Sequence, residues 1–162
     1  KVPYALAMPE PIYRERDSMK HLLIVDDNDK YARILDEYYK NLGYSIDRAV
    51  DGASGYSAVK EKGLEHYHVI VTDITMETQM AGLTMLKRLY KDGYRGMVVV
   101  ASTGFDVPMA KPLTRCFLGR MGIDYLVPKT TVLSGKLEYY PMAFFSKPIM
   151  DFREIESNHK IA

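Results

Sequence analysis

The sequence predicts a single α/β domain, built on a doubly wound, five-stranded parallel sheet with helices on both faces. Two observations support this fold class. Apolar runs of strand length alternate with longer stretches whose apolar residues recur at helical spacing. Several of these runs are apolar throughout, which is typical of parallel strands buried on both faces. The length of 162 residues suits one domain and is too short for two ordinary ones.

The elements alternate along the chain from strand to helix. Each expected strand is a short apolar run bounded by polar or turn residues; the strands cover 22–25, 44–50, 69–71, 97–101 and 143–146. Each expected helix shows helical spacing of its apolar residues, and several stop at a glycine; the helices cover 28–43, 53–62, 83–91, 109–121 and 151–160.

Two segments fall outside this alternation. Residues 1–18 lack a clean period, and Met19 resembles a natural start, so we expect a leader or N-terminal extension before a domain of residues 19–162. Residues 123–142 stand between the expected fourth helix and fifth strand. Because this segment is too apolar for a solvated loop, we expect an ordered insertion. It would either offer a tyrosine-rich surface for a homodimer or partner, or simply cap the core.

The composition limits the possible partners. Lys and Arg (22) nearly balance Asp and Glu (21), so we expect no direct binding to nucleic acid or to a membrane surface. The single cysteine, Cys116, cannot form an intramolecular disulfide, and no apolar run approaches bilayer length. We therefore expect a soluble, cytoplasmic protein. His66 and His68 are a weak metal candidate, since no cysteine or third histidine lies near them in the sequence.

Polar side chains follow the ends of four expected strands. They are Asp26, Asp27, Asp73, Thr103 and Lys147. Each could be a helix cap, a turn residue or a surface charge when taken alone. The carboxyl ends of parallel strands form the ligand-binding edge of such folds, so together they indicate a site. Clustered carboxylates call for a cation, and an all-oxygen site favours Mg²⁺.

Four motifs in this order resemble the receiver domain of two-component response regulators. They are LLIVDDN at 22–28, VIVTDITM at 69–76, VVVASTG at 98–104 and FFSKPI at 144–149. The resemblance spans about residues 20–160 and implies the flavodoxin-like fold of CheY-like receivers. It also implies signalling through partners: a histidine kinase or phosphotransfer protein upstream, and an unknown output protein downstream.

The resemblance further implies a role for each site residue. Asp73 would accept the phosphoryl group, while Thr103 and Lys147 would contact its oxygens. The implied Mg²⁺ ligands are Asp26, Asp27, Asp73 and the backbone carbonyl of Thr75. Such a domain catalyses only its own phosphorylation and dephosphorylation, so we expect a phosphoacceptor rather than an enzyme.

Two alternatives remain open at the level of sequence. GIDYLVPK, ending at Lys129, also resembles a fifth strand with its lysine. We favour Lys147 because joining Gly122 to AFFSKPI restores the usual receiver spacing and because Lys-Pro is the family form; Lys129 would then be remote from Asp73.

For function, the alternative is a receiver-like interaction domain that works without phosphorylation. A phosphatase with an aspartyl nucleophile is disfavoured, since Thr75 stands where those enzymes carry an acid.

Overall fold

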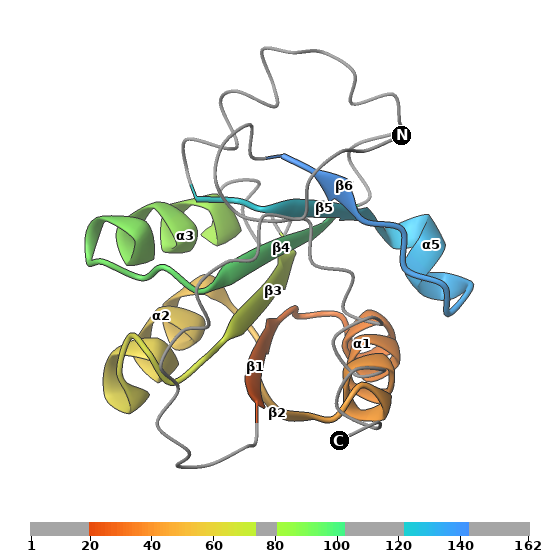
Figure 1. The fold of residues 1–162 in the computed structure, drawn as a ribbon, viewed down its shortest axis with the longest axis horizontal. Helices are drawn as coiled ribbons and strands as arrows, with labels where there is room; N and C mark the ends of the chain where they lie inside the picture. The colour runs from red at the N-terminus through yellow and green to blue at the C-terminus, as the bar shows by residue number, and fades with distance from the viewer. Residues whose placement is uncertain (1–19, 74–80, 103–121, 143–162) are drawn as a thin grey trace, which may run out of the picture.

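The computed structural model describes residues 20–73, 81–102 and 122–142, which form a layered α/β fold (Figure 1). The sheet has the order β2-β1-β3-β4-β5-β6. Its strands are β1 (Lys20–Val25), β2 (Tyr44–Ala49), β3 (Val69–Asp73), β4 (Met97–Ser102), β5 (Tyr125–Pro128) and β6 (Tyr140–Pro141). The first five pair in parallel, as predicted, and β6 adds an antiparallel strand beside β5.

Helices cover both faces of this sheet. They are α1 (Asp29–Asn41), α2 (Gly52–Lys62), α3 (Ala81–Lys91) and α5 (Lys129–Leu133). Figure 1 shows α2 and α3 on one face and α1 and α5 on the other. Within the described residues no helix is long and apolar enough to cross a membrane.

The fifth strand corrects one sequence prediction. We expected residues 123–142 to be an insertion before a fifth strand at 143–146, but β5 lies inside that segment and pairs in parallel with β4. Most apolar side chains of the segment 123–142 pack in the core and do not form a partner surface. The buried ones include Tyr125, Leu126, Val127, Val132 and Leu137. Residues 143–162 lie outside the described part of the chain, as do residues 1–19.

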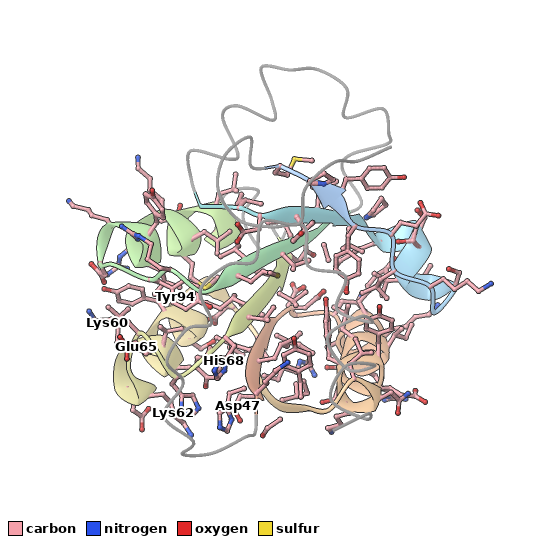
Figure 2. All side chains as sticks on the ribbon, in the orientation of Figure 1. Asp47, Lys60, Lys62, Glu65, His68 and Tyr94 are labelled. Atoms are coloured by element: carbon pink, nitrogen blue, oxygen red, sulfur yellow. The ribbon has the colours of Figure 1, made fainter. Side chains whose placement is uncertain are left out.

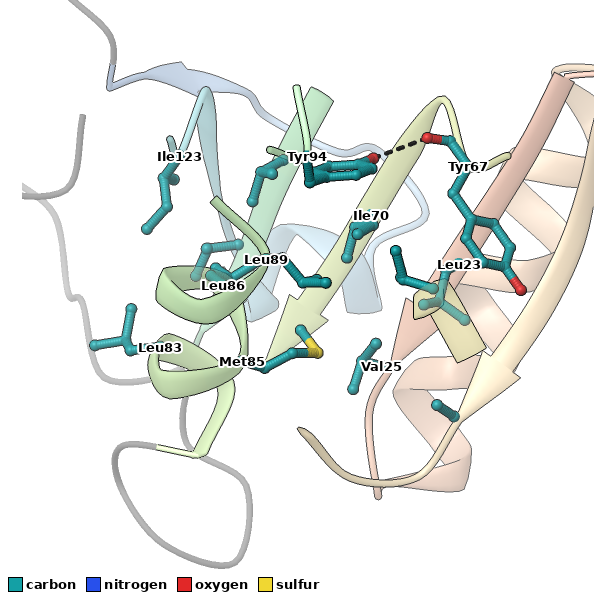
Figure 3. Packing of buried hydrophobic residues seen from close by; sticks show 14 of the residues in the cluster. Leu23, Val25, Tyr67, Ile70, Leu83, Met85, Leu86, Leu89, Tyr94 and Ile123 are labelled. Carbon is teal, nitrogen blue, oxygen red and sulfur yellow. Dashed lines mark hydrogen bonds between the residues drawn. The ribbon is translucent and has the colours of Figure 1, made fainter. Parts of the chain in front are cut away.

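Strand β1 shows why the fold needs both layers of helices. Leu22 and Ile24 pack toward α1, whereas Leu23 and Val25 pack toward α2 and α3, and all four side chains are fully buried. Figure 3 shows the second of these clusters, in which leucines of α3 meet Leu23, Val25 and Ile70. The alternation of side chains along a strand thus distributes a continuous apolar run over two cores.

Capping residues fix where α1 and α2 begin. Asn28 accepts hydrogen bonds from the backbone N–H groups of Lys30 and Tyr31. Asp51 and Ser54 form a reciprocal capping box at the start of α2. These side chains satisfy N–H groups that have no partner inside a helix. The first cap matters for the site, because the capping residue Asn28 directly follows Asp26 and Asp27.

Buried tyrosine hydroxyls link elements on both faces of the sheet. The Tyr94 hydroxyl donates to the backbone oxygen of Tyr67 at 2.9 Å, as drawn in Figure 3. On the other face the hydroxyls of Tyr39 and Tyr139 lie 2.8 Å apart and join α1 to the segment before β6. Burial raises the pKa of Tyr39 and Tyr139 well above its usual value, so both hydroxyls stay protonated.

Three histidines gather at the amino ends of β1 and β3, away from the carboxyl ends. The rings of His21 and His66 stack with centroids 4.3 Å apart, and the His68 Nδ1 accepts a hydrogen bond from the His21 backbone N–H. Figure 2 labels His68 near Asp47 and Lys62. Within the described residues these rings do not form a three-ligand metal group. Burial and the charge of His21 both lower the pKa of His66.

The close packing of α2 predicts a steric effect at Gly55. A Cβ at this position would lie 2.8 Å from the Met85 sulfur and 3.0 Å from a methyl group of Val25. We expect Gly55→Val to lower the free energy of unfolding by about 1–3 kcal/mol, measured by urea denaturation. Ser57→Val, on the exposed face of the same helix, is the matched control and should cost well under half as much. Equal losses for both variants would contradict the packing argument.

The histidine group predicts a pH dependence of stability. The pKa of His66 lies below its usual value of 6.5 in the folded protein, so the unfolded chain takes up a proton first as the pH falls. Acidification through and below pH 6.5 therefore favours unfolding, and above that range the effect vanishes. The urea midpoint should fall more between about pH 7.5 and pH 5.5 in the wild type than in His66→Gln. Parallel pH profiles for the two proteins would refute this assignment.

Candidate functional site

The acidic residues predicted from the sequence meet at the carboxyl ends of two adjacent strands. Asp26 follows β1 and Asp73 ends β3, and these strands pair in parallel with Val25 opposite Thr72. Carboxylate oxygens of Asp26, Asp27 and Asp73 all lie within 4.8 Å of one another. Asp26 and Asp73 are buried, whereas Asp27 is exposed to solvent. The prediction that these three carboxylates form one cluster is confirmed.

A buried lysine completes this cluster, and it is Lys129. Its Nζ lies 2.6 Å from Asp73 Oδ2 and 3.0 Å from Asp26 Oδ2. The side chain is only 3% exposed, so its charge depends on these two carboxylates for compensation. The expectation that Lys129 is remote from Asp73 is therefore wrong.

The strand before Lys129 explains this correction. Asp124 fixes β5 beside β4, because its carboxylate accepts the Val98 N–H at 2.9 Å while its own N–H donates to the Val98 oxygen. The register then places Pro128 opposite Ser102. Lys129 follows at once, as the first residue of α5, and reaches Asp73 from the far side of β4.

Three other predicted site residues lie outside the described part of the chain. They are Thr75, Thr103 and Lys147. The predicted cis bond between Lys147 and Pro148 lies outside it as well. The roles that the resemblance gives to Thr75 and Thr103 stay predictions.

Two neighbours of the cluster were missed by sequence reasoning. Arg48 of β2 donates to the backbone oxygen of Asp26 at 3.0 Å and pairs with Asp29 at 2.7 Å. The Tyr31 ring of α1 lies under the Lys129 ammonium, 4.2 Å from its centroid. No local sequence pattern indicates that either residue lies near the site. Arg48 occupies an ordinary polar position of a strand, and Tyr31 occupies one of the apolar positions of α1.

The turn that bears the acids is held from several sides. The Asn28 N–H donates to Asp26 Oδ1 at 2.8 Å, and the Asp26 N–H donates to the Ala49 oxygen at 3.1 Å. With the two Arg48 contacts, these bonds connect the turn to both β2 and the start of α1. The direction of the Asp26 carboxylate is therefore set before any ligand binds.

The charges of the cluster do not balance. Three carboxylates face the single ammonium of Lys129 among the described residues. Burial raises the pKa of Asp26, and only part of that effect is offset by the Asn28 N–H and by Lys129. Burial alone would lower the pKa of Lys129, but its hydrogen bond to Asp73 and the charges of Asp26 and Asp73 raise it above its usual value. The lysine therefore stays charged, and the described residues set three carboxyl groups against this one cation.

This arrangement fits a small divalent cation. The donors are all carboxylate oxygens, which Mg²⁺ prefers, and few of them come from the protein, as is usual for Mg²⁺. The buried Asp26 Oδ2 pairs with Lys129 by charge but has no hydrogen-bond partner in suitable geometry. An oxygen buried without a donor is one that a metal ion can satisfy.

Comparison with known families agrees with this geometry. Residues 22–131 match the family described as the response regulator receiver domain. The chain belongs to this family. Receiver domains act in two-component signalling. The matched range includes Asp26, Asp73 and Lys129 and ends before Lys147, which supports the assignment of Lys129 as the site lysine.

One curated relative matches part of the chain. Over 88 residues the chain is 32% identical to the uncharacterized transcriptional regulatory protein YkoG of Bacillus subtilis (strain 168), a match covering 54% of this chain and 37% of that protein. The chain thus matches little more than a third of this relative's length.

Solved structures share the fold. The receiver domain of Francisella response regulator 1452 is 22% identical, with a TM-score of 0.56 over 88% of this chain and 94% of that one. The Vibrio cholerae chemotaxis protein CheY4 is 16% identical, with a TM-score of 0.56 over 90% of this chain and all of that one. A receiver domain protein from Clostridium thermocellum is 14% identical, with a TM-score of 0.56 over 72% of this chain and 94% of that one.

The contacts of Lys129 predict that substitutions at the two candidate lysines differ in their effect on stability. Lys129→Met removes the only described cation between two buried carboxylates, which should lower the free energy of unfolding at neutral pH by about 3–5 kcal/mol. Added Mg²⁺ should restore part of the loss by supplying positive charge. Lys147→Met should leave the urea midpoint close to that of the wild type. If Lys147→Met is the destabilised variant and Lys129→Met is not, the lysine assignment must be reversed.

Proposed function

We propose that this receiver domain accepts a phosphoryl group on Asp73 from a histidine kinase or phosphotransfer protein in a Mg²⁺-dependent reaction. The observation that carries the proposal is the position of Asp73. Its carboxylate is buried at the end of a central strand, beside two further carboxylates and in contact with the Lys129 ammonium. The family membership of the chain supports the same reaction.

The chemical step is a transfer between two nucleophiles. An Asp73 carboxylate oxygen attacks the phosphorus of a phosphohistidine, a new O–P bond forms, and the N–P bond to the donor imidazole breaks. The imidazole nitrogen leaves with the bonding electron pair, and Asp73 becomes an acyl phosphate. No base is needed to activate the nucleophile, because a carboxylate oxygen attacks without first losing a proton.

The chain's own residues supply position and charge. The Lys129 ammonium lies 2.6 Å from Asp73, so it can donate a hydrogen bond to a phosphoryl oxygen and stabilise the charge that develops on that oxygen. Asp26 and Asp27, together with Asp73, would hold the Mg²⁺, and the Thr75 carbonyl would join them. When bound, the ion supplies the positive charge that phosphoryl transfer requires. Thr103 would donate its hydroxyl to the phosphoryl group.

The product would change how the domain meets its partners. An acyl phosphate adds charge and acceptor oxygens at the edge of the sheet where loops converge. We propose that this alters the affinity for an output protein, and that the domain acts as a phosphoacceptor that catalyses only its own modification. The alternative, an interaction domain that works without phosphorylation, gives no role to the uncompensated charge of the acidic cluster.

A small phosphodonor tests the proposal directly. With acetyl phosphate and Mg²⁺, we expect the intact protein to gain the mass of one phosphoryl group, and EDTA should prevent the gain. Asp73→Asn should abolish labelling, while Asp27→Asn should slow it by roughly tenfold or more through weaker ion binding.

Asp36→Asn is the matched control, since this acid pairs with Lys40 on the surface of α1 and lies outside the acidic cluster. It should label at the wild-type rate. A folded wild-type protein that takes up no phosphoryl group would favour the alternative function. Labelling of Asp73→Asn at the normal rate would mean that another residue is the acceptor.

A further inference from the structure

The ammonium of Lys129 has an aromatic neighbour besides its two carboxylates. Its Nζ lies 4.2 Å from the centroid of the Tyr31 ring, well within the range of a cation–π contact. The lysine is buried, so little water competes for its charge. Attraction between a cation and the face of an aromatic ring is strongest when the cation is desolvated, as here.

Tyr31 lies in the first turn of α1, directly after the turn that bears the acids. The Asn28 side chain caps α1 by accepting the backbone N–H groups of Lys30 and Tyr31, at 3.0 Å and 3.4 Å. The Asn28 N–H in turn donates to Asp26. Arg48 pairs with Asp29 at the first position of the helix. These bonds fix the start of α1, and with it the backbone of Tyr31, relative to the carboxylates.

The three neighbours of the ammonium differ in what a metal ion does to them. Asp26 and Asp73 are oxygen ligands of the proposed Mg²⁺ site. A bound ion would therefore compete with the Lys129 ammonium for these two carboxylates. An aromatic face is not a ligand for Mg²⁺, which takes oxygen donors. The contact between Lys129 and Tyr31 is therefore the one that persists when a metal ion binds to the carboxylates.

We propose that Tyr31 is a positioning residue that keeps the Lys129 ammonium beside Asp73 while a metal ion and a phosphodonor compete for the carboxylates. The acting part is the ring face, not the hydroxyl group. This inference rests on the proposed function of Asp73 as phosphoacceptor. It adds to that function a residue from α1 that acts through the lysine and does not touch the phosphoryl group.

Two substitutions separate the ring from the hydroxyl group. Tyr31→Phe keeps the aromatic face, so its rate of labelling by acetyl phosphate at saturating Mg²⁺ should stay within about twofold of the wild type. Tyr31→Leu removes the face and should slow labelling by roughly tenfold. Tyr31→Gln is a second variant without the ring and should behave like Tyr31→Leu. The urea midpoint of each variant shows whether it is folded.

A second measurement follows the contact itself, without any phosphodonor. Protons next to the Lys129 nitrogen lie over the ring, so their NMR signals should be shifted upfield in the wild type and in Tyr31→Phe. The shift should persist when Mg²⁺ is added. In Tyr31→Leu it should be absent. Lys129→Met assigns the signals by their disappearance.

The outcomes are distinct. The role of Tyr31 would be overturned if Tyr31→Leu and Tyr31→Gln were labelled at the wild-type rate. It would also be overturned if the upfield shift were lost once Mg²⁺ binds. Either result would leave the proposed function intact. A wild type that accepts no phosphoryl group would overturn the proposed function, and the NMR comparison would still decide whether the ring holds the ammonium. Slow labelling of both variants without the ring, with normal labelling of Tyr31→Phe, supports the proposal.

Discussion

The contact between the Lys129 ammonium and the carboxylates of Asp26 and Asp73 joins three strands of the sheet. Asp26 follows β1, Asp73 ends β3, and Lys129 follows β5. A buried charge is costly unless an opposite charge meets it in good geometry. The carboxyl ends of these three strands must therefore be aligned along the strand direction. β4 stands between β3 and β5, and its pairing on both sides provides that match. The site and the sheet therefore constrain each other.

The surroundings of this contact are arranged to orient groups rather than to neutralise them. Arg48 binds the backbone oxygen of Asp26 and the side chain of Asp29, and leaves the carboxylate of Asp26 to the cluster. The N–H of Asn28 binds only one oxygen of that carboxylate. Negative charge thus accumulates at one edge of an otherwise electrically balanced chain. An edge of this kind can attract a divalent cation. Under the proposed function, such a cation would offset the charge that otherwise repels a phosphoryl group.

Most of the fold could be predicted from the sequence, because apolar runs and their polar ends follow directly from the needs of a buried parallel sheet. Strands β1, β3 and β4 and the three clustered acids were predicted in this way. The fifth strand was misplaced, since YLVP and AFFS are equally short and apolar, and each is followed by a lysine. The buried bond from Val98 to Asp124 decides between them, and it depends on neighbours far apart in the sequence. Arg48 and Tyr31 escaped prediction for the same reason.

The small antiparallel strand β6 has a consequence for how securely the lysine is placed. Because β6 pairs with β5 through Tyr125 and Leu126, the strand that precedes Lys129 has hydrogen-bonded neighbours on both sides. A slip of β5 by one residue would displace Lys129 by about 3.3 Å and turn each side chain to the opposite face of the sheet. Such a slip would have to break two ladders at once. The charge facing Asp73 is therefore secured by strand register, and substitutions in β6, which contributes no residue to the acidic cluster, can loosen it.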